Sequence, residues 1–149
     1  LKVPFIAYSK NKINPGINTT IMASMIDFYP TLLDLCGVET KADPKVIGKS
    51  FAKQLLLNKS TKNNEVQFFM GRLKASKGKQ TGFRGVRTGQ YKLAYDNTEK
   101  GLVPYFFDIQ KDPFELNNIY NEKNAVIKTL CKQLKNYLKS NNDPFADLL

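Results

Sequence analysis

The sequence predicts an α+β fold in which a small antiparallel sheet of about four strands is packed by a long C-terminal amphipathic helix. Two observations predict the strands: apolar residues alternate within residues 65–72, 82–95 and 103–109, and the middle run is divided by the turn-forming pair Thr88-Gly89. A third predicts the helix, since apolar residues recur at helical spacing over residues 122–139.

A strand and a helix precede this sheet. Residues 3–8 are an apolar run and predict a buried strand. Residues 27–37 predict a helix that Asp27 caps and Gly37 ends, with Pro30 in the first turn, where a missing N–H is harmless. The apolar face of this helix comprises Phe28, Leu32, Leu35 and Cys36.

A polar stretch at residues 58–64 marks a boundary, so we expect two parts, residues 1–58 and 59–149. Gly48-Lys49-Ser50 lies in the first part. It lacks the earlier glycine of a phosphate-binding loop, because Asp43 stands at that position, and it indicates a turn before a short helical segment.

The central hairpin places an arginine on an apolar face. Pairing Arg87 with Gln90 puts Arg84 beside Val86, Tyr91, Leu93 and Tyr95. A guanidinium buried on such a face needs a carboxylate or carbonyl partner. A bulge at the glycine would exchange the two faces. A basic loop is expected before this hairpin, at residues 74–81.

The remaining elements follow in order. Pro104 indicates that the strand at residues 103–109 is an edge strand, and Asp112 before Pro113 is suited to accept backbone hydrogen bonds in the next turn. Asn121 is the expected cap of a helix that begins near Glu122. The tail, residues 141–149, is expected to be loose, with Phe145 and the last two leucines available to dock.

The composition excludes several kinds of site. The chain has 149 residues and no histidine, so the commonest general base and metal ligand are absent. Cys36 and Cys131 are far apart and predict small core residues. No apolar run reaches the length that crosses a bilayer. The net charge of +10 favours a solvated surface or a polyanion partner, and no nucleic-acid partner is expected.

Five motifs follow one another in a specific order. They are Val3-Pro4-Phe5-Ile6, the segment Asp27–Gly37 with Pro30-Thr31-Leu32-Leu33, Gly48-Lys49-Ser50-Phe51, Arg84-x-x-Arg87-Thr88-Gly89-x-Tyr91-Lys92-Leu93, and Asp108-Ile109-x-x-Asp112-Pro113-x-Glu115-x-Asn117-Asn118. Together they run through nearly the whole chain. In this order they resemble the C-terminal part of the sulfatase family, within the alkaline phosphatase-like superfamily.

The resemblance implies a sulfate ester hydrolase whose catalytic groups lie upstream of this chain. Such enzymes use a formylglycine, made from Cys or Ser, and a calcium ion held by Asp and Asn; none of these can be assigned here. Residues 1–58 would end the α/β catalytic domain. Residues 59–149 would form a subdomain that packs on the missing N-terminal catalytic domain and borders the pocket for a sulfated glycan. The family is largely exported or lysosomal.

The candidate site residues are three arginines, since guanidinium groups bind anionic oxygens in bidentate fashion: Arg72, Arg84 and Arg87. The structural alternative is an ion pair that joins the sheet to a neighbouring layer. No catalytic or metal-binding residue is predicted. The alternative functions are a non-catalytic polyanion-binding module and the C-terminal part of a phosphate-ester hydrolase or transferase of the same superfamily.

Overall fold

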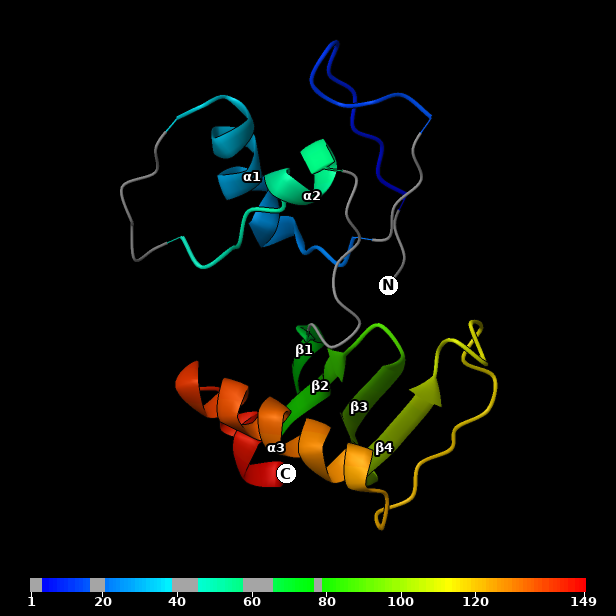
Figure 1. The fold of residues 1–149 in the computed structure, drawn as a ribbon. Helices are drawn as coiled ribbons and strands as arrows, with labels where there is room; N and C mark the ends of the chain where they lie inside the picture. Colours follow the sequence, from blue (N-terminus) through cyan, green and yellow to red (C-terminus); the bar gives the residue numbers. More distant parts are fainter. Residues whose placement is uncertain (1–3, 17–20, 39–45, 58–65, 77–78) are drawn as a thin grey trace. The chain divides into compact units, whose positions relative to one another are not determined.

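The computed structural model describes residues 4–16, 21–38, 46–57, 66–76 and 79–149. The chain divides into two compact units, residues 1–62 and 63–149, here called unit 1 and unit 2. The predicted boundary between residues 58 and 59 lies outside the described residues. Both units appear in Figure 1.

Unit 2 is built on a four-stranded antiparallel sheet in the order β1-β2-β3-β4. The strands are β1 (Gln67–Ser76), β2 (Lys79–Arg87), β3 (Tyr91–Thr98) and β4 (Gly101–Asp108). Each pairs with the next strand along the chain. Helix α3 (Ala125–Ser140) lies across one face of the sheet (Figure 1). The predicted α+β fold is therefore confirmed.

The central hairpin has the predicted faces but a different register. The observed pairs are Arg87 with Lys92, Val86 with Leu93 and Arg84 with Tyr95. Thr88 closes the turn, because its N–H donates to the Tyr91 carbonyl (2.8 Å) and its hydroxyl accepts from the Tyr91 N–H (2.9 Å). The register differs from the predicted one by two residues. Side chains alternate with a period of two, so the shift leaves every residue on its predicted face.

The predicted basic loop at residues 74–81 is wrong, because β1 and β2 continue into it. Lys74 pairs with Thr81, and Ser76 pairs with Lys79. Strands pair through their backbone groups, so polar side chains do not prevent a hairpin from extending beyond the core. The register shifts between Gly71 and Lys74, so Arg72 lies at a bulge.

β4 is an edge strand, as Pro104 predicted. Its outer edge is covered by the segment that follows it. The Asn118 amide donates to the Pro104 carbonyl (3.0 Å) and accepts from the Phe106 N–H (2.9 Å). The Ile119 N–H donates to the Phe106 carbonyl (2.9 Å). These contacts satisfy backbone groups that would otherwise offer a pairing surface to other chains.

Two aspartates organise the turn after β4. Asp108 accepts from the Gln90 side chain (3.2 Å) and from the backbone N–H groups two and three residues further on. Burial raises the pKa of Asp108, but these hydrogen bonds outweigh it, and the net pKa is lowered. Asp112 accepts from the Asn117 N–H (2.8 Å), as predicted, and this bond with its neighbours lowers the pKa of Asp112.

Helix α3 begins three residues later than predicted. Its N-cap is Asn124, whose side chain accepts from the Val126 N–H (2.8 Å). Asn121 instead accepts from the Lys123 N–H (3.0 Å) and forms the preceding turn. Both asparagines can cap a helix, and the sequence alone did not distinguish them.

The core of unit 2 lies between α3 and the sheet. It is formed by the predicted stripe of the helix and by one face of β2, β3 and β4: Ile127, Leu130, Leu134 and Leu138 against Val86, Leu93, Tyr95 and Phe106. Tyr95 is hydrogen-bonded with Cys131 and Tyr120, and burial, the larger cause, together with these contacts raises its pKa. Phe68 of β1 stacks on Tyr137, with ring centroids 4.0 Å apart.

The C-terminal tail is ordered, so its predicted looseness is wrong. Residues Pro144–Leu148 form the short helix η2, capped by Asp143, which accepts from the Phe145 N–H (3.0 Å). Phe145 is 1% exposed and belongs to the core. The apolar Phe145 was the signal for this docking, and its burial offsets the entropy lost on ordering the tail.

Unit 1 contains three short helices, η1 (Met25–Asp27), α1 (Phe28–Leu35) and α2 (Ala52–Leu57), in the residues described. Asp27 joins them: its carboxylate accepts from the Ser24 N–H (2.7 Å) and the Lys49 N–H (2.8 Å). Thr31 donates to the Asp27 carbonyl (2.6 Å) and accepts from the Phe51 N–H (3.0 Å).

Two glycines of unit 1 have defined roles. Gly48 passes so close to η1 that a Cβ there would lie 1.9 Å from the Ile26 carbonyl oxygen, which explains why a glycine follows Ile47. Gly37 ends α1 with a φ of 72°, as predicted.

The predicted buried strand at residues 3–8 is not formed. Residue 3 lies outside the described residues, and residues 4–8 have no regular secondary structure. Ile6 and Tyr8 are 91% and 83% exposed. A buried strand needs neighbouring strands for its backbone groups, and the described part of unit 1 contains none. Cys36 is also exposed, so its predicted place in a core is wrong.

Among the described residues, no helix combines the length and the apolar character that crossing a bilayer requires.

The first prediction concerns the core of unit 2. Replacing Leu134, which is 1% exposed, by alanine is expected to lower the free energy of unfolding by about 3 kcal/mol, because it leaves a cavity between α3 and the sheet. Urea unfolding followed by circular dichroism measures this loss. The control is Gln133→Ala on the exposed side of α3, for which we expect a change within about 0.5 kcal/mol. Equal losses in the two variants would contradict this packing.

Candidate functional site

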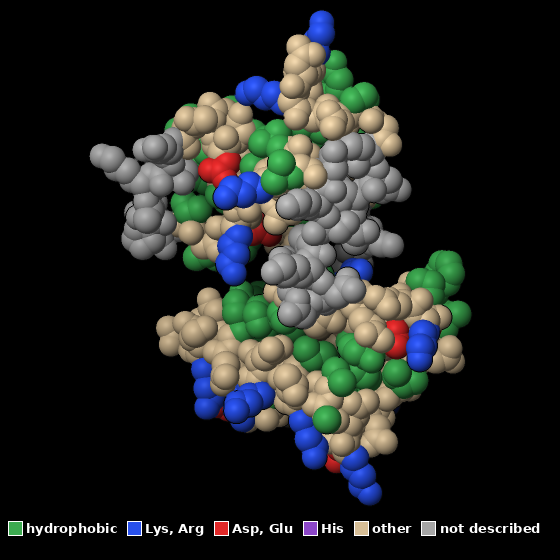
Figure 2. All heavy atoms as spheres, viewed as in Figure 1, with side chains coloured by type: hydrophobic (Ala, Val, Ile, Leu, Met, Phe, Trp, Pro, Cys, Tyr) green, Lys and Arg blue, Asp and Glu red, His purple; other side chains and the backbone are tan. Residues whose placement is uncertain are grey.

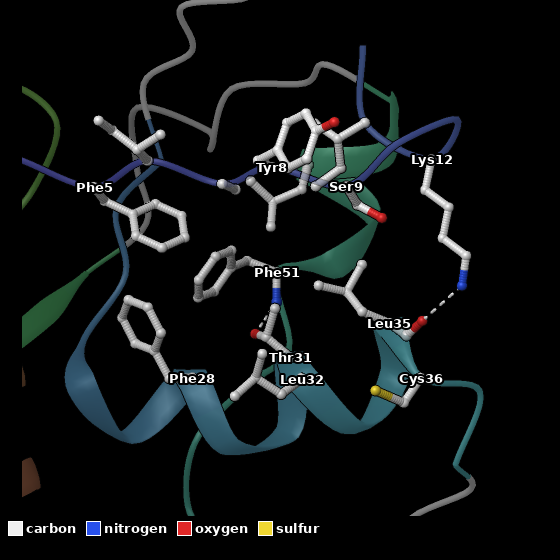
Figure 3. A pocket seen from close by; sticks show the side chains of 14 residues that line it. Phe5, Tyr8, Ser9, Lys12, Phe28, Thr31, Leu32, Leu35, Cys36 and Phe51 are labelled. Atoms are coloured by element: carbon white, nitrogen blue, oxygen red, sulfur yellow. Dashed lines mark hydrogen bonds between the residues drawn. The ribbon is translucent and has the colours of Figure 1, made fainter. Parts of the chain in front are cut away.

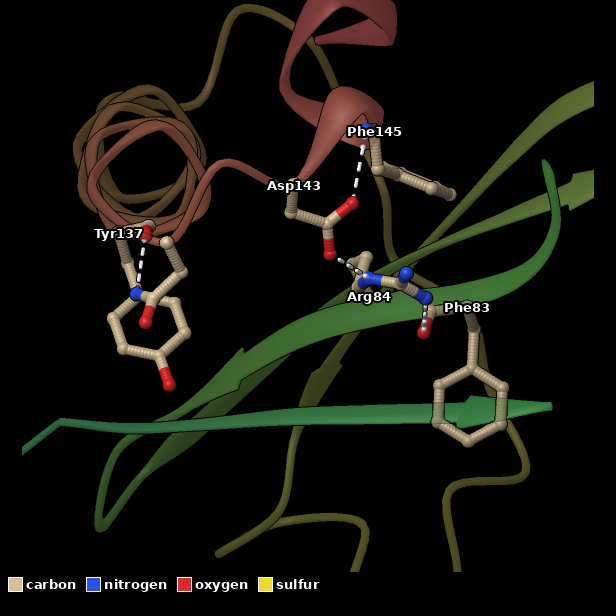
Figure 4. A network of polar contacts seen from close by, with 6 residues as sticks. Phe83, Arg84, Tyr137, Asp143 and Phe145 are labelled. Atoms are coloured by element: carbon tan, nitrogen blue, oxygen red, sulfur yellow. Dashed lines mark hydrogen bonds and ion pairs between the residues drawn. The ribbon is translucent and has the colours of Figure 1, made fainter. Parts of the chain in front are cut away.

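Arg84 projects from β2 toward η2 and is buried there. Its Nε lies 2.6 Å from Asp143 Oδ2, and its Nη1 donates to the Phe83 carbonyl (3.2 Å). Its guanidinium carbon lies 5.2 Å from the centroid of the Phe145 ring. The side chains of Arg84 and Asp143 are 3% and 12% exposed. Figure 4 shows the ion pair between the sheet and the start of η2.

This ion pair joins strand and tail, because Asp143 also caps η2 through the Phe145 N–H (Figure 4). Burial raises the pKa of Asp143, but the bonds from Arg84 and Phe145 lower it by more, so its pKa is below the ordinary value. The carboxylate partner that the sequence required for Arg84 is thus Asp143, 59 residues further along the chain. The sequence does not predict Asp143 as this partner, because the tail that contains it is expected to be loose.

The face of the sheet opposite α3 carries half-buried aromatic and cationic side chains. We call it the open face, and the strand register places on it Phe69 of β1, Phe83 and Arg87 of β2, Lys92 of β3 and Tyr105 of β4. In the described part of unit 2, no helix covers this face (Figure 1).

Two glycines leave room for rings of the open face above neighbouring strands. A Cβ on Gly71 would stand 2.3 Å from Phe83, and one on Gly85 would stand 2.2 Å from Phe69. The centroids of these two rings are 5.9 Å apart. The absence of a side chain at these two positions therefore permits the close packing of the rings, whose planes are tilted by 60°.

The two cations of the open face differ in their partners. Lys92 forms an ion pair with Glu115, and its Nζ lies 5.7 Å from the centroid of the Phe69 ring. Arg87 pairs with Lys92 across the strands, yet its Nε is buried and has no hydrogen-bond partner among the described residues. A buried donor without a partner is costly, so Arg87 is poised to bind an oxygen acceptor.

Arg72 lies in β1 at the bulge, and its side chain is outside the described residues. The structure therefore does not bring the three candidate arginines together. Arg84 lies on the α3 face and Arg87 on the open face, because they are three residues apart in one strand. Their contact with an anionic substrate group stays a prediction.

Unit 1 contains an open apolar pocket of about 420 Å³ (Figure 3). Three phenylalanines that line it meet edge to face. The ring centroids of Phe5 and Phe28 are 5.1 Å apart, and those of Phe28 and Phe51 are 5.5 Å apart. Leu32 also lines the pocket and is 59% exposed. The predicted apolar stripe of α1 is thus directed to this pocket and not to a closed core.

The described residues contain no group of three or more His, Cys, Asp or Glu side chains that could hold a metal ion. The open face offers a guanidinium and aromatic rings, which bind and orient but do not transfer protons or act as nucleophiles.

The chain matches the family described as N-sulphoglucosamine sulphohydrolase, C-terminal, over residues 1–143. It is 29% identical to an endo-4-O-sulfatase of Bacteroides thetaiotaomicron, over 97% of this chain and 31% of that protein. It is 28% identical to arylsulfatase K of Rattus norvegicus, over 85% of this chain and 23% of that protein. The chain spans less than a third of the length of these relatives.

Several solved structures resemble this fold. One is yidJ of Bacteroides fragilis, assigned to the sulfatases, with 31% identity and a TM-score of 0.74 over 93% of this chain and 29% of that one. Another was determined in complex with its substrate D-glucosamine-2-N,6-O-disulfate, with 26% identity and a TM-score of 0.64 over 81% of this chain and 25% of that one. The predicted resemblance to the C-terminal part of sulfatases is confirmed.

The second prediction concerns the Arg84–Asp143 pair. Asp143→Asn leaves the buried guanidinium without a counter-charge and is expected to lower the free energy of unfolding at pH 7 by about 3 kcal/mol. Folding lowers the pKa of Asp143. The ionised carboxylate therefore stabilises the fold at pH values above its unfolded-state pKa near 3.8, and this stability is lost as the pH falls through the lower folded-state pKa.

Urea unfolding at pH values from 2 to 7 tests this. The wild type should lose stability below about pH 4, and Asp143→Asn should lose less there, with a remaining slope from Asp108 and Asp112. The control is Asp147→Asn, an exposed residue of the same short helix, which should behave like the wild type. Parallel pH profiles for wild type and Asp143→Asn would contradict this role.

Proposed function

The chain belongs to the N-sulphoglucosamine sulphohydrolase C-terminal family, and we propose that it is the C-terminal part of a sulfatase that hydrolyses sulfate esters of a glycan. One observation carries the proposal: the family match covers residues 1–143, yet the chain spans less than a third of its relatives. The glycan as substrate class is supported by the endo-4-O-sulfatase and by the structure with a sulfated glucosamine.

In this proposal, residues 1–58 complete the α/β catalytic domain, and residues 59–149 are its C-terminal subdomain. The apolar surface of unit 1 supports this. Ile6, Tyr8 and Leu32 are 91%, 83% and 59% exposed, an amount of exposed apolar surface that a stable soluble domain avoids. The missing N-terminal catalytic domain is the proposed partner of this surface, and it would supply the strands beside residues 3–8.

The calcium ion and the formylglycine of such enzymes do not fit the residues described here. No cluster of metal ligands is present among them, and neither cysteine has the sequence context of a formylglycine precursor, since Cys36 is followed by Gly37-Val38 and Cys131 by Lys132-Gln133. We therefore place both groups upstream. This chain would contribute support and substrate binding, and no chemical step is assigned to it.

The open face is the part of unit 2 that best suits a docking or binding role. Arg87 Nε is a buried donor without a hydrogen-bond partner among the described residues, and the rings of Phe69 and Phe83 are half-buried. A carboxylate or carbonyl of the upstream domain is the acceptor we propose for Arg87 Nε. Arg84 would have a structural role, because its ion pair with Asp143 holds η2 on the sheet. Arg72 at the bulge would border the substrate.

The third prediction tests the function. The chain of residues 1–149 alone is expected to show no hydrolysis of 4-nitrophenyl sulfate or of a sulfated glycan, whereas the same chain with its upstream coding sequence should release sulfate. Ion chromatography of released sulfate measures this, with 4-nitrophenyl phosphate as the matched phosphate ester. Turnover by residues 1–149 alone, or phosphate release without sulfate release from the longer protein, would overturn the proposal.

The fourth prediction concerns Arg87. In residues 1–149 alone, Arg87→Met removes an unpaired buried donor and should raise the free energy of unfolding by about 1 kcal/mol. In the longer protein the same change should cost about 1–3 kcal/mol, since it leaves the acceptor across the domain contact unpaired. Thermal unfolding of both forms measures the difference, and Lys100→Met on the exposed β3–β4 turn is the control. Equal effects in the two forms would speak against an interdomain contact of Arg87.

A further inference from the structure

Helix α3 carries all its charges on one flank. Its sequence contains four lysines and no acidic residue. The lysines stand at positions i, i+4, i+7 and i+11: Lys128, Lys132, Lys135 and Lys139. At 3.6 residues per turn they fall within an arc of about 60° and extend for about 17 Å along the helix axis.

This arrangement differs from an ordinary solvated helix surface. The lysines occupy one side of the exposed arc, and the other side of that arc is uncharged, with Ala125, Thr129, Gln133, Asn136 and Ser140. Lysines that serve only solubility are expected to be spread over the whole exposed arc and mixed with acidic residues. Here they are adjacent at spacings of three and four, where like charges destabilise a helix.

The four lysines form no ion pair within the described part of the chain. The ion pairs there are Arg84–Asp143 and Lys92–Glu115, and none of the four lysines lies within ion-pair distance of a carboxylate. Lys139 alone lies in the last turn, where the helix dipole favours a cation. Figure 2 shows Lys and Arg side chains projecting from unit 2 on the side where α3 lies in the same view.

We propose that the lysine flank of α3 is a secondary binding site for a sulfated polysaccharide. The inference rests on the proposed function, and it takes the sulfated glycan proposed there to be a polymer with repeating anionic groups. A row of four ammonium groups suits such a polymer, because each binds an anionic group as a point charge and needs no fixed geometry. The core stripe Ile127, Leu130, Leu134 and Leu138 holds this row in place.

The test is binding of residues 1–149 to heparin, measured by titration calorimetry at several salt concentrations. The variant Lys128→Gln/Lys132→Gln/Lys135→Gln/Lys139→Gln should bind at least about tenfold more weakly at low salt, and its slope of log affinity against log salt should fall by about three. Glutamine keeps the helix propensity of lysine, and circular dichroism checks that the fold remains. Fully desulfated heparin should bind the wild type much more weakly.

The control variant is Lys10→Gln/Lys12→Gln/Lys100→Gln/Lys111→Gln, which removes the same charge from exposed positions outside α3. It should keep most of the heparin affinity. Equal losses in the two variants, no binding by the wild type, or tighter binding to single-stranded DNA than to heparin would overturn the proposal. These readouts need no turnover, so a failure of the lysine flank is distinguishable from a failure of the proposed sulfatase function.

In the longer protein, the α3 variant is expected to keep wild-type kcat and KM with 4-nitrophenyl sulfate and to show a raised KM with a long sulfated polysaccharide. An unchanged KM for the polymer would also contradict the lysine flank as a substrate-binding surface.

Discussion

The burial of the apolar stripe of α3 on one face of the four-stranded sheet is the interaction on which unit 2 depends. Leu93 and Val86 are fully buried beneath it, and Leu134 and Leu138 are 1% exposed. Because α3 covers this face of the sheet, the positions of three other groups of side chains follow. Arg84 is enclosed with Asp143 at the end of the helix, the open face keeps its aromatic side chains, and the lysines of α3 are directed to solvent on one flank.

Much of unit 2 could be predicted from periodicity alone. The stripe of α3 and the strand faces repeat at 3.6 and 2 residues, and an even register shift leaves the faces unchanged, so the hairpin prediction placed Arg84 correctly although its pairing was wrong. The partner of Arg84 could not be found, because an ion pair across 59 residues leaves no local pattern. The helix η2 did have local signals, the cap Asp143 followed by Pro144 and the apolar Phe145, but its short length gave no helical periodicity.

In unit 1, by contrast with unit 2, the local hydrophobic pattern predicts burial that the structure does not show. Residues 3–8 have the composition of a buried strand, and α1 has its apolar stripe, yet Ile6, Tyr8 and Leu32 are exposed. Hydrophobic pattern specifies which side chains are to be buried but not what buries them. A segment can therefore carry the pattern of a buried element although the described residues around it leave its apolar side chains exposed.

The central claim is that unit 2 folds by itself, whereas unit 1 requires the upstream part of the proposed sulfatase to close its core. Amide hydrogen exchange of residues 1–149 and of the longer protein tests it most directly. We expect α3 and β3 to be protected equally in both, and residues 4–8 and α1 to be protected only in the longer protein. Equal protection of unit 1 in the two forms, or loss of protection across β3 and α3 in the shorter one, would contradict this account.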